Sequence, residues 1–155
     1  LMRPWFRGRT LRSPVTLWAR SKRDQVNALT VRENTMHEGA CHCGAVRLTL
    51  PSTPEVATAC NCSLCRRTGG PWVYFEFGTV EIQGHPESTA EYIQGDRTLR
   101  TIRCRTCGCV THWEPLQPTP GCKHGVHLGN FDPKLIAAVR VRRFDGAGTW
   151  AFIDD

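Results

Sequence analysis

The stretch Cys41–Gly44 reads CHCG, and the later stretch Cys104–Gly108 reads CRTCG. In each, two closely spaced cysteines are followed by a glycine, which lets the backbone turn behind the second sulfur. Zinc prefers four sulfur or nitrogen ligands at tetrahedral corners, and two such pairs supply four. We therefore predict one closed, structural zinc site that ties an early strand to a late one and supports folding. Its four ligands would be Cys41, Cys43, Cys104 and Cys107.

Between these pairs lies a third cluster, in the stretch Cys60–Gly70, which reads CNCSLCRRTGG. Three protein ligands with one open position are the arrangement expected of catalytic zinc, and the open position can take water or a substrate thiol. A thiol bound there loses its proton near neutral pH and becomes a nucleophile. We predict that this catalytic zinc is held by Cys60, Cys62 and Cys65.

Arg66 and Arg67 follow the cluster directly. Their charge offsets that of three thiolates, and a guanidinium can also receive a substrate carboxylate. The alternative for both is a solvated surface role. For the cluster itself, the alternatives are a second structural zinc, completed by Cys109, Cys122 or a histidine, and a redox-active disulfide.

The cysteine count and the charge distribution limit the class of protein. Nine cysteines is an odd number, and no secretory signal is visible, so we expect reduced, metal-binding cysteines in the cytoplasm. Residues 1–35 hold eight of the 20 basic and two of the 14 acidic residues, which leaves 12 of each in the rest of the chain. A neutral domain argues against a nucleic-acid partner. No stretch reaches the ~20 apolar residues of a membrane span.

Short apolar stretches separated by Gly, Pro and polar turns predict a mainly β fold of small antiparallel sheets. Residues 45–50 show the clearest alternation of apolar and polar side chains. One short helix is expected at Pro133–Val139, with Asp132 as its N-cap. The other expected strands are residues 56–59, 72–77, 80–83, 90–93, 99–104, 110–113, 126–130 and 139–144.

Residues 1–35 are Arg-rich and lack sustained periodicity, and Met36 follows them. We expect a basic N-terminal extension that is not part of the domain, and a domain that covers residues 36–155. The alternative is a mitochondrial-type transit peptide, but Pro4 and Pro14 interrupt any long amphipathic helix.

Three stretches together resemble the glutathione-dependent formaldehyde-activating enzyme family. They are residues 39–46 (GACHCGAV), residues 60–69 (CNCSLCRRTG) and residues 104–108 (CRTCG), and seven cysteines fall in the family order. The resemblance runs from about Met36 to the C-terminus. Asn61 stands where many members have a histidine, and Cys109 is an additional thiol.

This resemblance implies a β-tent fold with two zinc ions per chain, the structural one on the first and last cysteine pairs and the catalytic one on the central cluster. It also implies a carbon–sulfur lyase that adds glutathione to formaldehyde and gives S-hydroxymethylglutathione. The expected partners are a small thiol and a small aldehyde, without nucleic acid or membrane. The alternative function is a non-catalytic zinc-binding module for protein interaction.

Overall fold

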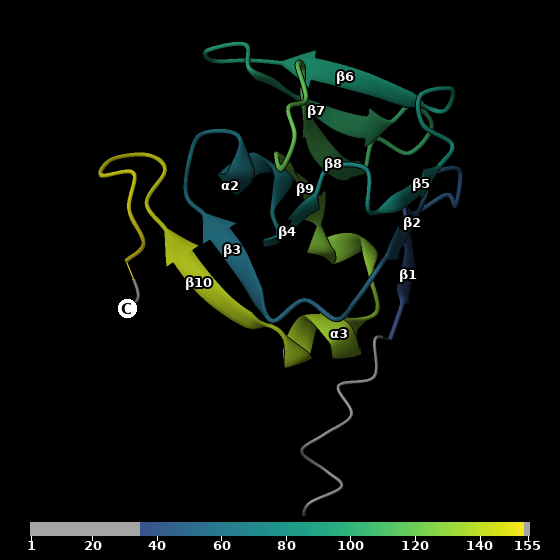
Figure 1. Ribbon diagram of the computed structural model, residues 1–155, viewed down its shortest axis with the longest axis horizontal. Coiled ribbons are helices and arrows are strands. Elements are labelled where there is room, and N and C mark those ends of the chain that lie inside the picture. The colour runs from purple at the N-terminus through teal and green to yellow at the C-terminus, as the bar shows by residue number, and fades with distance from the viewer. Residues whose placement is uncertain (1–34, 154–155) are drawn as a thin grey trace, which may run out of the picture. The chain divides into compact units, whose positions relative to one another are not determined.

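The computed structural model describes residues 35–153, which form a mainly β fold with few helices, so the predicted fold class is confirmed (Figure 1). The predicted extension, residues 1–35, lies outside the described residues except for Thr35, and the boundary at Met36 stays a prediction. No helix among the described residues is long and apolar enough to cross a membrane. The strands are β1 (His37–Ala40), β2 (Arg47–Leu50), β3 (Val56–Cys60), β4 (Trp72–Glu76), β5 (Glu81–Gln83), β6 (Thr89–Ile93), β7 (Leu99–Cys104), β8 (Val110–Pro115), β9 (Lys123–His127) and β10 (Arg140–Phe144). The helical elements are α2 (Cys65–Thr68), the 3₁₀ turn η2 (Leu128–Asn130) and α3 (Pro133–Ala138).

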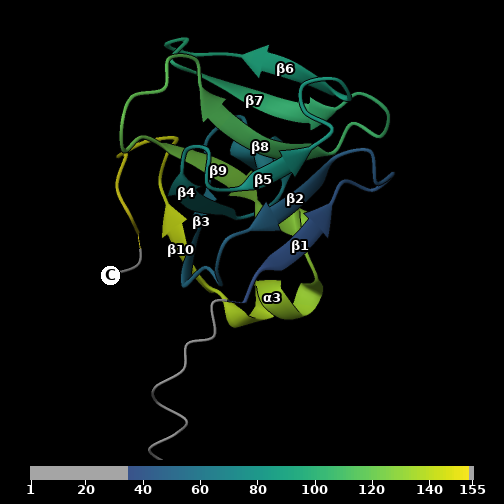
Figure 2. The same cartoon turned by 45° about the vertical axis from the view of Figure 1, so that its right-hand side comes forward.

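The strands form two sheets (Figures 1 and 2). A three-stranded sheet has the order β1-β2-β5, and a seven-stranded sheet has the order β10-β3-β4-β9-β8-β7-β6. The pair β3–β10 is parallel, and the other pairs among the described strands are antiparallel. The turn β1–β2 belongs to the small sheet and the turn β7–β8 to the large one, so a link between these turns joins the two sheets.

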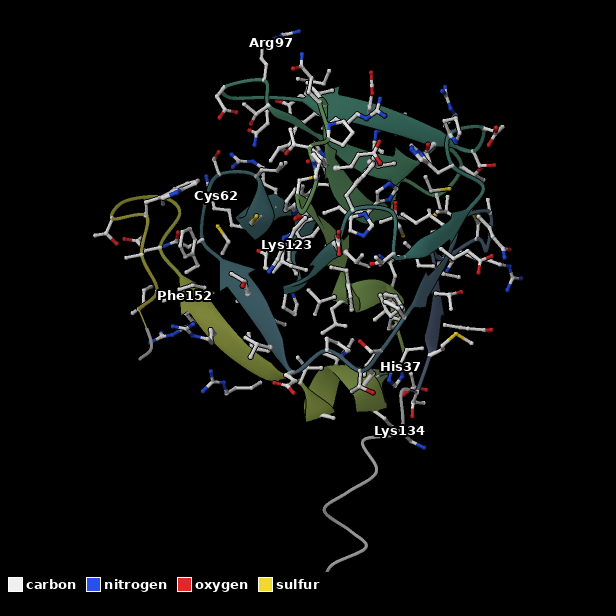
Figure 3. All side chains as sticks on the ribbon, in the orientation of Figure 1. His37, Cys62, Arg97, Lys123, Lys134 and Phe152 are labelled. Carbon is white, nitrogen blue, oxygen red and sulfur yellow. The ribbon has the colours of Figure 1, made fainter. Side chains whose placement is uncertain are left out.

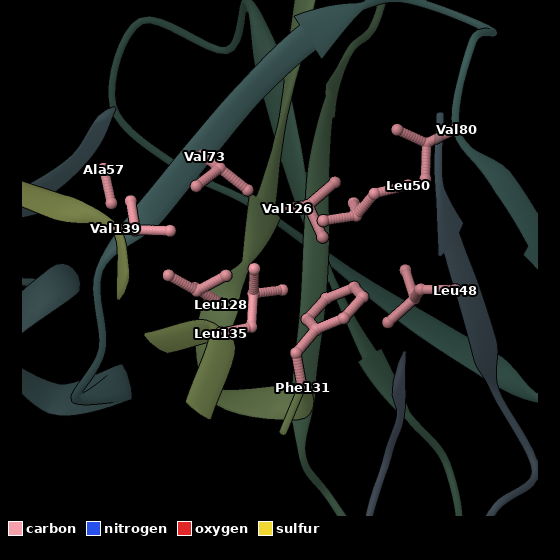
Figure 4. Packing of buried hydrophobic residues seen from close by; sticks show 10 residues of the cluster. All are labelled: Leu48, Leu50, Ala57, Val73, Val80, Val126, Leu128, Phe131, Leu135 and Val139. Atoms are coloured by element: carbon pink, nitrogen blue, oxygen red, sulfur yellow. The ribbon is translucent and has the colours of Figure 1, made fainter. Parts of the chain in front are cut away.

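Strand β2 shows why the small sheet packs on the large one. Leu48 and Leu50 are buried, whereas Arg47 is exposed, as the alternation predicts. Both leucines belong to one buried cluster with Val73 of β4 and Val126 of β9 (Figure 4). Each fully buried Leu or Val contributes about 1.5–3 kcal/mol of hydrophobic stabilisation. The whole cluster is Leu48, Leu50, Ala57, Val73, Val80, Val126, Leu128, Phe131, Leu135 and Val139.

Helix α3 packs against this core and contributes Leu135 to it. Asp132 caps the helix, because its Oδ1 accepts a hydrogen bond of 2.7 Å from the backbone N–H of Lys134. Pro133 occupies the first turn, where its missing N–H costs nothing. The predicted helix and its cap are therefore confirmed, although the helix ends at Ala138, one residue earlier than expected.

Three local expectations were wrong. The expected strand 126–130 starts earlier, at Lys123, and its second half is the turn η2. The residues of β9 alternate poorly because two buried positions are histidines, His124 and His127. Helix α2 was missed because four residues are too short for a helical period. Strand β1 was missed because Gly39 sits where a side chain is expected; an added Cβ there would lie 2.7 Å from the ring of Phe131.

Candidate metal centres

The first and last cysteine pairs meet at one point between the two sheets. Cys41 and Cys43 lie in the turn from β1 to β2, Cys104 ends β7, and Cys107 lies in the turn from β7 to β8. Their four sulfur atoms all lie within 4.8 Å of one another. Gly44 and Gly108 have φ angles of +78° and +75°, a left-handed conformation that glycine adopts without strain. The structure therefore brings together all four residues predicted for the closed site.

The spacing of these sulfurs fits zinc. The Sγ atoms of Cys41 and Cys43 are 3.6 Å apart, and those of Cys43 and Cys104 are also 3.6 Å apart. A tetrahedron with zinc–sulfur bonds of ~2.3 Å has edges of ~3.8 Å, so the four thiols need little movement to hold an ion. The backbone N–H of Val46 donates to Cys41 Sγ at 3.3 Å, and that of Thr106 donates to Cys104 Sγ at 3.4 Å. Such donors favour the thiolate form that binds metal.

Crowding of these thiols separates their pKa values. The backbone N–H groups of Cys109 and Cys43 lower the pKa of Cys107 to about 5. For Cys43, the N–H of Ala45 lowers the pKa, but desolvation and the neighbouring thiols outweigh it and raise the pKa to about 12. Adjacent sulfurs cannot all be anionic without a cation, because like charges disfavour each other. A divalent cation removes this conflict, so the donor set fits a metal ion.

The additional thiol, Cys109, lies beside this group without joining it. The backbone N–H of His42 lowers its pKa, but burial and the thiol of Cys107 have the larger combined effect, and its pKa is raised. His42 itself is exposed, as expected for a residue between two ligands. Cys122 is half-buried and belongs to neither cysteine group.

The central cluster is assembled at one end of β3. Cys60 is the last residue of β3, Cys62 lies in the loop, and Cys65 begins α2. Their sulfurs lie within 4.8 Å of one another, and all three residues are half-buried. The N–H of Cys62 donates to Cys60 Sγ and the N–H of Cys65 donates to Cys62 Sγ, both at 3.4 Å. The tight C-x-C-x-x-C spacing therefore places three sulfurs around one point. The Cys62 side chain of this cluster is labelled in Figure 3.

The proton affinities of this cluster also differ from sulfur to sulfur. Burial raises the pKa of Cys65 well above its usual range, and contact with Cys62 and the charge of Cys60 add to this effect. For Cys62, burial acts in the same direction, but the N–H groups of Cys65 and Leu64 and the neighbouring thiols outweigh it and lower its pKa. The cluster thus has the donors of a three-thiolate metal site.

Within residues 35–153, no other His, Cys, Asp or Glu offers a ligand atom to this triad. The predicted alternative, a second closed site completed by Cys109, Cys122 or a histidine, therefore finds no fourth ligand in the described part of the chain. Three protein ligands with one open position are the arrangement of catalytic zinc sites.

A loop near the C-terminus covers one side of the central cluster. The Asn61 side chain donates from Nδ2 to Asp145 Oδ1 at 2.7 Å and accepts at Oδ1 from the Ala147 N–H at 2.9 Å. A Cβ added to Gly146 would lie 2.6 Å from Cys60 Sγ. The loop therefore passes against the sulfur, and Asn61, which stands between two of the cysteines, fastens it there.

Tyr74 is a site residue that the sequence reasoning missed. It lies in β4 and is 40% exposed. Burial raises the pKa of Tyr74, and a hydrogen bond with Thr58 partly offsets this. The negative charges of Cys65 and Cys60 raise it further, so the phenol lies within electrostatic range of the cluster. The phenol therefore keeps its proton at neutral pH and can donate it. Alternation along β4 shows which side chains lie on the same face of the sheet as Tyr74, but not that this face meets the cysteines.

The two arginines after the cluster are exposed. Arg67 donates from Nη1 to the backbone oxygen of Ser63, which holds its guanidinium group against the loop before α2. It also lines a shallow pocket of about 270 Å³ beside the helix, together with Ser63, Leu64, Tyr92 and Gln94. No contact places Arg66 or Arg67 within the sulfur cluster itself.

Comparison with known proteins agrees with this arrangement. The family model described as glutathione-dependent formaldehyde-activating enzyme matches residues 36–144, which contain all the cysteines of both groups. Among solved structures, the chain is similar to a Rhodobacter sphaeroides protein known from a crystal structure, with 30% sequence identity and a TM-score of 0.54. That match covers 67% of this chain and 98% of the other. The chain therefore belongs to the glutathione-dependent formaldehyde-activating enzyme family.

Proposed function

We propose that the protein is a zinc-dependent carbon–sulfur lyase that adds a small thiol such as glutathione to a small aldehyde such as formaldehyde. Membership of the family supports the reaction type. The observation that carries the proposal is the triad Cys60, Cys62 and Cys65, which gathers three sulfurs without a fourth ligand from residues 35–153. The four-cysteine group would hold the second, structural zinc.

A zinc ion on the triad would supply Lewis-acid chemistry, because it lowers the pKa of a thiol in its remaining position. In the net reaction the thiol loses its proton, a sulfur–carbon bond forms, the carbonyl π bond breaks, and the carbonyl oxygen takes up a proton. The addition is not intrinsically difficult, so the protein contributes mainly activation and proximity.

Other side chains would assist at named atoms. The Tyr74 hydroxyl group, which stays protonated, would donate to the aldehyde oxygen as negative charge develops there. Arg66 and Arg67 would bind glutathione carboxylates, and the shallow pocket lined by Arg67 beside α2 supports such a role. The loop at Gly146 would limit access of water to one side of the cluster.

The proposal is tested by measuring the exchange of ¹³C-formaldehyde between free and glutathione-bound forms by NMR. Wild-type protein should accelerate this exchange above the spontaneous rate, and Cys62→Ser should not. Cys122→Ser is the matched control, because it removes a thiol outside both groups, and it should behave as wild type. Equal exchange rates with and without zinc-loaded wild-type protein would refute the proposed reaction and favour the alternative, a non-catalytic zinc module.

A further inference from the structure

A third group of potential metal ligands lies apart from both cysteine groups. His85 stands in the turn between β5 and β6, and His112 and Glu114 stand two residues apart on β8, on one face of the strand. One ligand atom from each residue lies within 4.8 Å of the others. None of the three has a role in the proposed reaction, so the function of this group is a separate question.

The group is largely withdrawn from water. The His112 side chain is fully buried, and 8% of the Glu114 and 18% of the His85 side chain are exposed. The Nε2 atom of His112 is buried and has no hydrogen-bond partner. Buried polar atoms are nearly always satisfied, so an orphaned ring nitrogen beside a carboxylate requires an explanation.

Two threonines contact the Nδ1 atoms of the two rings. Thr89 Oγ1 lies 3.1 Å from the backbone oxygen of Pro86, to which it can donate, and 2.7 Å from His85 Nδ1. A hydroxyl group has one hydrogen to donate, so when Thr89 donates to Pro86 it accepts from the ring. In that arrangement the proton of His85 lies on Nδ1, and Nε2 presents a lone pair.

The same arrangement recurs at the second histidine. Thr111 Oγ1 lies 3.3 Å from the backbone oxygen of Ile102, to which it can donate, and 3.0 Å from His112 Nδ1. When Thr111 donates to Ile102, His112 also carries its proton on Nδ1 and presents a lone pair at Nε2. Two histidines with threonine-held Nδ1–H groups are oriented as metal-ligating histidines commonly are.

Both lone pairs face the oxygens of one carboxylate. His85 Nε2 is 3.4 Å from Glu114 Oε1, and His112 Nε2 is 3.8 Å from Glu114 Oε2. Acceptors that face acceptors in a buried place repel one another unless a cation lies between them. A proton is one such cation, but it can bridge only one pair of atoms, and a fully buried imidazolium is costly.

We propose that His85, His112 and Glu114 form a third metal site that binds one divalent first-row transition ion. Two imidazoles and one carboxylate suit zinc, iron, cobalt or nickel better than the oxygen-seeking calcium and magnesium. Bonds of ~2.0–2.2 Å at tetrahedral angles put ligand atoms about 3.4 Å apart. One ligand atom from each of the three residues lies within 4.8 Å of the others, so a modest closure would seat an ion.

Arg100 sets the charge of this site. Its Nε and Nη2 contact Glu114 Oε1 at 2.7 and 2.6 Å, which leaves Oε2 for an ion. Its Nη1 pairs with Glu91 at 2.7 Å, so a second carboxylate offsets the guanidinium charge. Because Arg100 already neutralises part of the charge of the Glu114 carboxylate, the site should bind an ion more weakly than the thiolate groups do.

The test uses the full chain with its cysteine groups loaded with zinc and dialysed to constant zinc content. Cobalt(II) is then added, and bound cobalt and zinc are counted after removal of free metal. Wild-type protein should gain one cobalt per chain without losing zinc. His85→Gln should bind cobalt at least about tenfold more weakly. The matched control is His37→Gln, which removes a histidine hydrogen-bonded to Thr53, outside the group, and it should bind as wild type.

NMR of the imidazole nitrogens in the wild-type chain gives a readout that does not depend on any variant. Before cobalt is added, both rings should carry a proton on Nδ1 and none on Nε2. A doubly protonated His85 or His112 ring, with no cobalt taken up, would overturn the proposal and show that a proton occupies the position proposed for the metal ion. Cobalt binding that is unchanged in a folded His85→Gln chain would also overturn it.

Discussion

Asn61 and Asp145 lie 84 residues apart in the chain and are joined by a hydrogen bond of 2.7 Å. This bond connects the loop that carries the central cysteines with the loop that covers them. The Asp145 carboxylate also accepts hydrogen bonds from the N–H and the hydroxyl of Thr149, which lies in the same loop. The integrity of the candidate active site thus depends on a residue that lies between two of its sulfur ligands.

Replacing Asn61 with Ala should loosen the covering loop. The change removes the bonds to Asp145 and Ala147, and each net hydrogen bond contributes about 0.5–1.5 kcal/mol. We expect faster amide hydrogen exchange at Ala147, measured by NMR, with the rest of the sheet unaffected. Ser63→Ala changes an exposed side chain of the same loop and is the control. Unaltered protection at Ala147 would show that the loop is held by other contacts.

Replacing Gly146 with Ala should disturb the cluster by steric contact. The new Cβ would lie 2.6 Å from Cys60 Sγ and 3.2 Å from Cys62 Cβ, so the sulfur or the loop must move. We expect weaker zinc retention in competition with a chelator and a loss of about 1–3 kcal/mol in unfolding free energy. Ala147→Ser is the control, because it adds one atom to an exposed side chain of the same loop. Zinc retention equal to that of wild type would argue against close contact between loop and sulfur.

The two cysteine groups should respond differently to the loss of one ligand. Cys104 is fully buried where the two sheets meet, and structural zinc sites carry apparent binding energies of roughly 10 kcal/mol. Cys104→Ser should therefore be unfolded or insoluble, whereas Cys62→Ser should stay folded and hold one zinc fewer. Circular dichroism and metal analysis measure both. A Cys104→Ser chain that unfolds cooperatively would contradict the structural assignment.

Replacing Tyr74 with Phe should slow the proposed reaction without affecting metal binding. The change removes only the hydroxyl group, whose pKa is raised in part by the charges of Cys65 and Cys60. Loss of one hydrogen-bond donor to a developing oxyanion costs about tenfold or more in rate. The formaldehyde exchange assay and the zinc content together test this point. A Tyr74→Phe protein as fast as wild type would exclude the phenol from the reaction.

Stability should fall with decreasing pH because His112 is buried in its neutral form. Burial lowers the pKa of His112 to about 3, whereas an unfolded histidine titrates near 6.5. Between these values the unfolded state binds the extra proton, so protonation favours unfolding as the pH falls. From pH 6.5 to 5.5 we expect a loss of about 1 kcal/mol.

Urea unfolding at these two pH values, without added divalent ions, measures the effect. His112→Gln should lack this part of the pH dependence, even if the variant is less stable at both pH values. His42→Gln, which replaces an exposed histidine, is the control. The same slope in His112→Gln as in wild type would assign the pH dependence to other groups.

The sequence predicted features that depend on local spacing. Cysteines two or three residues apart must place their sulfurs near one point, so the central cluster and each outer pair could be anticipated before their geometry was known. The meeting of the two outer pairs was predicted from the four ligands that zinc prefers. Burial of Leu48 and Leu50 followed from alternation in the same way. The turn η2 could not be anticipated, because the apolar residues around Leu128 suit a strand equally well.

Features that depend on long-range contacts could not be predicted from a single sequence. Gly146 approaches Cys60 only because β10 pairs with β3, and the parallel register of these strands has no local signal. His85, in the turn between β5 and β6, and His112, on β8, likewise come from separate parts of the fold, with no motif spacing between them. To predict Tyr74 as a site residue would have required knowing which face of the sheet meets the cysteines.

The central claim is that the triad of Cys60, Cys62 and Cys65 leaves a position for a thiol from solution. Its most direct test is a glutathione titration of the cobalt-substituted protein, followed by the thiolate-to-cobalt charge-transfer absorption. The third site contains no sulfur and does not contribute to this band. The absorption should rise and saturate at one glutathione per chain in wild type, and should not rise in Cys62→Ser. A spectrum that glutathione leaves unchanged, with both cysteine groups filled, would contradict the claim.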